Sequence, residues 1–310
     1  MAEWLYEAGI GEARAALVAD GAILKARIEL EGLRAGTVVE GRLRADNQVE
    51  LREGKVLIDR AAVPEGALLT VRITREAIPE PGRAKLAKAV ATNEPPAPGP
   101  DLLARITASG IPVRHLRPYE ADLLEQAGWS ETLEEAMTGE IAFPGGALRM
   151  AVTPAMTLFD VDGATPPESL ALAAARAVAA AIQRHGITGS IGVDFPTLAN
   201  KAARLALGEA IDAALPQPFE RTAVNGFGFL QIVRRRTRAS LPELLLADPA
   251  GAEARAALRH IERLPPPLPA THIVGGRVAR TLAQRPAWTA ELARRMGGAI
   301  ELKEKTLGQA

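Results

Sequence analysis

Apolar and polar residues alternate in short runs through the first quarter of the chain, which is typical of β-strands. Residues 12–30 alternate on both sides of Asp20-Gly21, a residue pair that favours a two-residue hairpin turn. Further short runs separated by turn residues lie at 36–43, 48–51, 55–59 and 67–74. Short strands with turns this close predict a small β-barrel of OB type over residues 33–92.

The middle of the chain combines strand-like and helix-like periods. Strands are expected at 147–152, up to Asp160, up to Asp194 and at 227–234, with helices at 167–185 and 199–214 between them. Pro167 suits a first helical turn, and Gly186 suits a helix end. This order predicts a sheet covered by helices, with ligands bound at strand ends.

The remaining segments connect these two regions or follow them. The prolines of residues 93–100 indicate a linker, followed by a helix at 101–110, a strand at 112–117 and a helix at 130–138. A last helix is expected at 252–263, before a small C-terminal domain.

Composition narrows the class of protein. Of the 310 residues, 47% are hydrophobic and 24% charged, which is typical of a soluble globular protein. The net charge is zero, so contact with a polyanion requires a local basic patch. The N-terminus has no signal-peptide pattern, and the most apolar run, 170–182, is too short to cross a bilayer. We therefore expect a cytoplasmic protein with no membrane contact.

Two apolar segments, residues 157–163 and 190–196, each deliver an aspartate, namely Asp160 and Asp194. If their strands are neighbours, the strand ends lie about 5 Å apart, and carboxylates at that range repel unless a cation lies between them. Oxygen ligands favour Mg²⁺, with Mn²⁺ as a substitute, and Asp162 lies on the same face as Asp160. The alternative interpretation is that they are ordinary turn residues at strand ends. From these residues alone, the metal site and the turn residues are equally supported.

A second group of residues suits contact with nucleic acid. Phe227 and Phe229 lie in the glycine-rich run 225–229, and Arg234 and Arg235 follow. Aromatic rings stack on bases and arginines contact phosphates. A buried strand with a solvated basic end is the alternative, and taken alone it is favoured about two to one. Arg83 and Lys85 form a further basic spot after the predicted barrel.

In order and spacing, several segments together resemble the ribonuclease E/G family of bacterial endoribonucleases. The segments that carry the resemblance are Ile10–Val18, Glu140–Gly146, Thr153–Gly163, Gly192–Phe195 and Asn225–Gln231.

The resemblance implies a mixed α+β and α/β fold. Residues 1–32 would form the N-terminal hairpin of a ribonuclease H-like subdomain, and 33–92 an inserted OB-type barrel. Residues 93–143 would hold the linker and the remainder of that subdomain. Residues 144–249 would form a deoxyribonuclease-like catalytic domain, and 250–310 a small C-terminal domain.

The resemblance also implies a Mg²⁺-dependent endoribonuclease that hydrolyses single-stranded RNA in RNA processing or decay. Asp160 and Asp194 correspond to the family's metal-binding aspartates. Arg234 and Arg235, Phe227 and Phe229, and Arg83 and Lys85 are the RNA-binding candidates.

The chain departs from the family pattern at three points. Asp162 stands where the family has Asn, the segment that senses the RNA 5′-phosphate has no counterpart, and there is no cysteine. The family links its subunits through cysteine-bound zinc, so we expect neither zinc nor a zinc-linked dimer.

Two alternatives remain open. An RNA-binding relative with weak or no cleavage would retain the basic and aromatic residues without a competent metal site. A metal-dependent phosphohydrolase of small molecules would need the aspartates alone and would show no salt-sensitive RNA binding.

Overall fold

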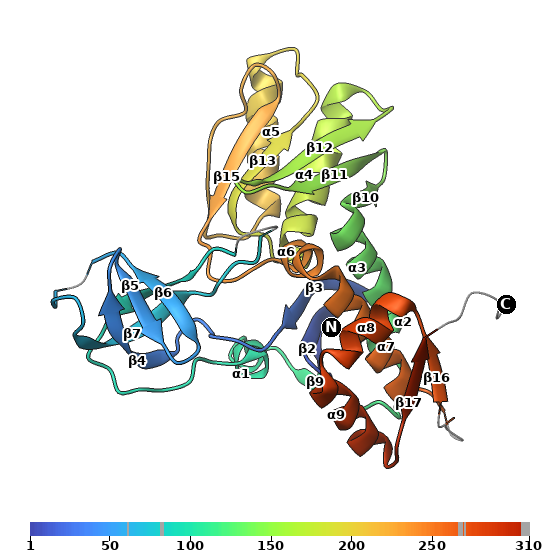
Figure 1. Cartoon of the computed structure of the whole chain (residues 1–310). Coiled ribbons are helices and arrows are strands. Elements are labelled where there is room, and N and C mark those ends of the chain that lie inside the picture. Colours follow the sequence, from blue (N-terminus) through green and yellow to red (C-terminus); the bar gives the residue numbers. More distant parts are fainter. Residues whose placement is uncertain (61, 81–83, 266–268, 270, 305–310) are drawn as a thin grey trace.

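The computed structural model describes the chain except residues 61, 81–83, 266–268, 270 and 305–310. It has mixed α/β architecture, with a closed barrel, a large mixed sheet and a helical C-terminal region arranged around a small N-terminal sheet (Figure 1).

The N-terminal sheet has the strand order β3-β2-β1-β9. Its strands are β1 (Glu3–Ala8), β2 (Ala13–Ala19), β3 (Ala22–Glu29) and β9 (Val113–His115). The predicted hairpin is confirmed, because Asp20 and Gly21 both have positive φ and join β2 to β3. Successive side chains of each strand point to opposite sides of the sheet. One side packs against α1 (Leu102–Thr107) and the other against α2 (Leu123–Gln126) and α3 (Trp129–Thr138).

The predicted barrel is confirmed as a closed five-stranded barrel. It consists of β4 (Val38–Arg44), β5 (Gln48–Leu51), β6 (Gly54–Ile58), β7 (Leu68–Arg75) and β8 (Ala87–Ala91). The sequence did not predict β8, since its alanines are weak strand formers. Ala87 and Ala89 are nevertheless buried, because β8 pairs with both β6 and β7 and closes the barrel.

The large sheet has six strands in the order β10-β11-β12-β13-β15-β14. They are β10 (Glu140–Phe143), β11 (Gly146–Val152), β12 (Thr157–Gly163), β13 (Gly189–Asp194), β14 (Glu220–Arg221) and β15 (Phe229–Arg234). Within it, β12 and β13 are parallel, whereas β11 runs antiparallel to β12 and β15 antiparallel to β13.

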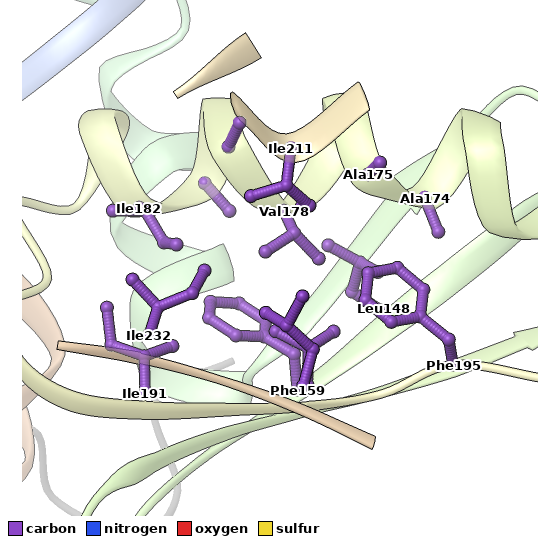
Figure 2. Packing of buried hydrophobic residues seen from close by; sticks show 14 of the residues in the cluster. Leu148, Phe159, Ala174, Ala175, Val178, Ile182, Ile191, Phe195, Ile211 and Ile232 are labelled. Atoms are coloured by element: carbon purple, nitrogen blue, oxygen red, sulfur yellow. The ribbon is translucent and has the colours of Figure 1, made fainter. Parts of the chain in front are cut away.

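Both helices that connect these strands pack on one face of the sheet. Figure 2 shows Val178 of α4 (Pro167–Arg184) and Ile211 of α5 (Lys201–Ala214) above Phe159 and Ile191 of the strands. The predicted helices are thus confirmed. The opposite face of the sheet carries exposed charged side chains instead.

One predicted strand end is wrong. The strand expected to end at Asp160 continues as β12 to Gly163, because its last residues pair with β11 as far as Gly146↔Gly163. Asp160 therefore lies within a strand, whereas Asp194 is the last residue of β13, as expected.

The C-terminal region is mainly helical. Its elements are α6 (Leu241–Ala247), α7 (Pro249–Glu262), β16 (Thr271–Val274), α8 (Gly276–Ala283), α9 (Pro286–Met296) and β17 (Glu301–Glu304). Only the helix at 252–263 was predicted, and α7 confirms it. Leu258 and Leu292 lie in the core that α7 shares with α8 and α9.

Candidate functional site

The register of β12 and β13 brings two of the predicted aspartates together. Asp160 and Asp194 are directly paired across the two parallel strands. Phe159 and Val193, one residue earlier in each strand, are buried against the helices, so the aspartates lie on the opposite, uncovered face. Both carboxylates are exposed. The condition set by the sequence, that the two strands be neighbours, is met.

Two carboxylates on adjacent strands lie near each other, because neighbouring strands are about 4.8 Å apart. Asp162 lies on the same face of β12, but β13 ends at Asp194 and gives Asp162 no neighbour on that side. Among the described residues, no group of three or more His, Cys, Asp or Glu side chains converges to hold a metal ion. Mg²⁺ is commonly held by only one or two carboxylates together with waters and substrate phosphates. Asp160 and Asp194 fit that donor set.

A basic side chain also lies on this face. Arg149 of β11 pairs with Asp160 in the strand register, and its guanidinium lies 3.6 Å from Asp162 and 3.7 Å from Glu140. Arg149 is mostly exposed, so these ion pairs contribute little to stability. No sequence motif pointed to Arg149 as a site residue. The alternation of apolar and polar residues could have shown that Arg149 faces away from the core, because the apolar Leu148 and Met150 on either side of it are buried.

The turn at residues 225–228 leads into β15, and Phe229, the first residue of β15, lies beside the aspartate pair. Phe229 is paired with Asp194 in the register, and Phe227 is 83% exposed. Asn225 Oδ1 accepts hydrogen bonds from the backbone N–H of Phe227 at 2.9 Å and of Phe229 at 3.0 Å, which fixes the turn. The ring of Phe229 packs closely on Gly192, where an added Cβ would lie 2.8 Å from the ring.

The predicted arginines lie at the other end of β15. Arg234 pairs with Gly189 at the start of β13, five residues before Asp194, which corresponds to roughly 17 Å along the strand. Burial lowers the pKa of the half-buried Arg234, whereas Arg235 is exposed. The structure therefore brings Phe229 to the aspartates, with Phe227 two residues before it in the turn, but not Arg234 and Arg235.

Of the predicted basic spot near the barrel, Arg83 lies outside the described residues. Lys85 donates to the carbonyl oxygen of Pro154 at 2.9 Å and is ion-paired with Glu80. Pro154 is in the turn between β11 and β12, so Lys85 holds the barrel segment against the large sheet.

A comparison of the chain with protein-family models and with curated proteins finds no match. In the described part of the chain, no helix is both long enough and apolar enough to cross a bilayer.

Proposed function

We propose that the chain is a metal-dependent endoribonuclease that hydrolyses single-stranded RNA in the manner of ribonuclease E/G. The observation that carries the proposal is the direct pairing of Asp160 with Asp194 on the uncovered face of the sheet. The family-like order of segments seen in the sequence supports it. In this proposal the barrel is of OB type, the N-terminal sheet belongs to a ribonuclease H-like subdomain, and the protein acts in the cytoplasm.

In this proposal Asp160 and Asp194 hold Mg²⁺, and Asp162 adds negative charge beside them. Bound Mg²⁺ would polarise the scissile phosphate and lower the pKa of the attacking water. The two carboxylates repel each other when no cation is bound, which favours cation binding. Hydrolysis would leave a 3′-hydroxyl and a 5′-phosphate.

The aromatic residues of the 225–229 turn would bind the RNA. Phe227 presents an exposed ring in the turn that leads into Phe229, where a base can stack. Phe229, paired with Asp194, would form the floor of the same site. Contacts made by Arg234 and Arg235 would fall on phosphates away from the cleaved bond, because these arginines lie at the other end of β15.

The first prediction concerns the aspartates. We expect Asp160→Asn and Asp194→Asn each to lower Mg²⁺-dependent cleavage of a single-stranded RNA oligonucleotide by at least about a hundredfold, because loss of groups that merely support a metal ligand already costs about 10–100-fold. Cleavage is measured by gel electrophoresis of end-labelled RNA over a Mg²⁺ titration.

Asp212→Asn is the matched control. Asp212 lies on α5, which covers the face of the sheet away from the aspartate pair. It is ion-paired with Arg221 at the surface. We expect this variant to cleave as the wild type does. Equal cleavage by the wild type and both site variants would contradict the proposal.

A second candidate function is RNA binding with weak or no cleavage. The ion pairs of Arg149 with Asp162 and Glu140 favour it, since a fixed cation already neutralises part of the acidic face. The same experiment separates the two functions. Absence of cleavage by the wild type, with RNA still retarded in a gel-shift assay, would identify the binding function.

A further inference from the structure

A cavity of about 140 Å³ lies where β3, the segment between α4 and β13, the end of β15 with the segment after it, and α6 meet. These elements lie near the centre of the molecule (Figure 1). Its lining includes Arg27, Arg105, Arg234 and Arg238, and no acidic residue of the described chain lines it. We call it the arginine cavity.

Arg27 is held in place by backbone carbonyls. Its guanidinium donates to the carbonyl oxygens of Gln183 and Arg184, each at 3.2 Å, at the C-terminal end of α4. An added Cβ at Gly186 would lie 3.1 Å from Arg27 Nη1, so a residue without a side chain lets the guanidinium approach. Burial, together with the charges of the other arginines of the cavity, lowers the pKa of Arg27 to about 10.

Carboxylates neutralise only part of this charge. Arg105 is ion-paired with Glu29 at 2.6 Å, and Arg238 lies 3.6 Å from Glu76. Arg27 and Arg234 have no carboxylate within ion-pair distance among the residues that the structure describes. Bringing desolvated like charges together is unfavourable. The fold nevertheless gathers four arginines here with too few carboxylates to neutralise them.

The cavity wall also contains buried polar atoms without hydrogen-bond partners. They are Thr188 Oγ1 and His185 Nδ1, and the side chain of His185 is fully buried. His185 uses its other ring nitrogen at 3.2 Å from Glu135. Leaving a buried polar atom without a hydrogen bond is unfavourable, so each such atom requires an explanation.

We propose that the arginine cavity binds a phosphate group. Guanidinium groups bind phosphate through paired, charge-assisted hydrogen bonds, and a phosphate oxygen can accept from the hydroxyl of Thr188 as well. A bound anion would offset the repulsion among Arg27, Arg234 and Arg238. The cavity lies at the opposite end of β13 from the aspartate pair, so this site is separate from the proposed cleavage site.

The phosphate belongs either to a small free anion or to the backbone of bound RNA. Titration of the full chain with inorganic phosphate by calorimetry tests the shared chemistry. We expect binding by the wild type, with the dissociation constant raised about tenfold or more in Arg234→Gln and Arg238→Gln, because each loses charge-assisted hydrogen bonds. Arg176→Gln is the matched control, since Arg176 is exposed on α4 and does not line the cavity, and we expect no change.

A second titration distinguishes the two sources. Fluorescence anisotropy of a short labelled RNA is measured with and without inorganic phosphate. Competition by phosphate, together with weaker RNA binding in Arg238→Gln, assigns the cavity to RNA. Phosphate binding without any effect on RNA assigns it to a free anion. Both results support the proposal.

Circular dichroism shows whether the variants fold. If they do not, phosphate protection of Arg234 and Arg238 in the wild type from phenylglyoxal, mapped by mass spectrometry, replaces them. Absence of phosphate binding by the wild type, or equal binding by all folded variants, would overturn the proposal. Neither result depends on RNA cleavage, which the aspartate variants test separately.

Discussion

At the scale of single residues, Gly228 fixes the position of the exposed Phe227. Gly228 has φ +95°, and an added Cβ would lie 2.2 Å from the carbonyl oxygen of Phe195. Its own carbonyl oxygen accepts from the N–H of Phe195, the residue after Asp194. The aromatic turn and the aspartate pair are thus joined through backbone atoms, for which only glycine leaves enough space.

We predict that Gly228→Ala destabilises the protein by at least about 1–2 kcal/mol, because the new side chain adds a backbone clash to an unfavourable φ. Chemical denaturation measures the free energy of unfolding. Gly226→Ala is the control: its Cβ would meet no atom within 4 Å. A similar, small effect of both substitutions would show that the turn tolerates a side chain at Gly228.

At the scale of elements, the helical period of α5 separates its buried residues from its exposed ones. Leu207 and Ile211 are fully buried against the sheet, whereas Leu205, two residues before Leu207, is 55% exposed. The sequence predicts this element well, because Asn200 caps the helix with a hydrogen bond to the N–H of Ala203 and its apolar positions repeat at helical spacing.

We predict that Leu207→Ala lowers the free energy of unfolding by about 2–5 kcal/mol, since it leaves a cavity in a packed core. Leu205→Ala removes the same atoms from a largely exposed position and is expected to change it by no more than about 0.5 kcal/mol. Thermal and chemical unfolding of both variants test the difference. Equal losses would place Leu205 in an interface that α5 forms with another surface.

At the scale of the whole molecule, a buried ion-pair network joins α7 to the N-terminal sheet. Glu7 of β1 is ion-paired with Arg14 of β2, with Arg259 of α7 at 3.0 Å and with Arg263 at 3.0 Å. Arg255 of α7 lies 2.8 Å from Glu12. These side chains are almost completely buried, so each charge depends on its partners.

We predict that Glu7→Gln destabilises the full chain by about 3–5 kcal/mol, because it removes the carboxylate that three buried arginines share and leaves them only Glu12 and Asp122. Glu50→Gln, which breaks an exposed ion pair with Arg44, is expected to have little effect. Both are measured by chemical denaturation. A small effect of Glu7→Gln would mean that Glu12 and Asp122 suffice to neutralise the network.

The sequence by itself determined many, but not all, of the local elements of this protein. Alternation and the Asp20-Gly21 turn predicted the first hairpin and four strands of the barrel, and the helical period predicted α4, α5 and α7. These features depend on neighbours in the chain. The sequence did not predict β8, because its alanine-rich segment forms a strand only through pairing with β6 and β7, which are distant in the chain.

Only the tertiary structure decided which predicted site residues lie together. The register of β12 with β13 places Asp160 beside Asp194, and the antiparallel register of β15 carries Phe229 to that pair while carrying Arg234 away from it. Arg27 and Arg105, far from Arg234 in sequence, line one cavity with it. The sequence shows which residues are charged. Which of them lie together depends on strand pairing between distant segments, and no local pattern encodes that pairing.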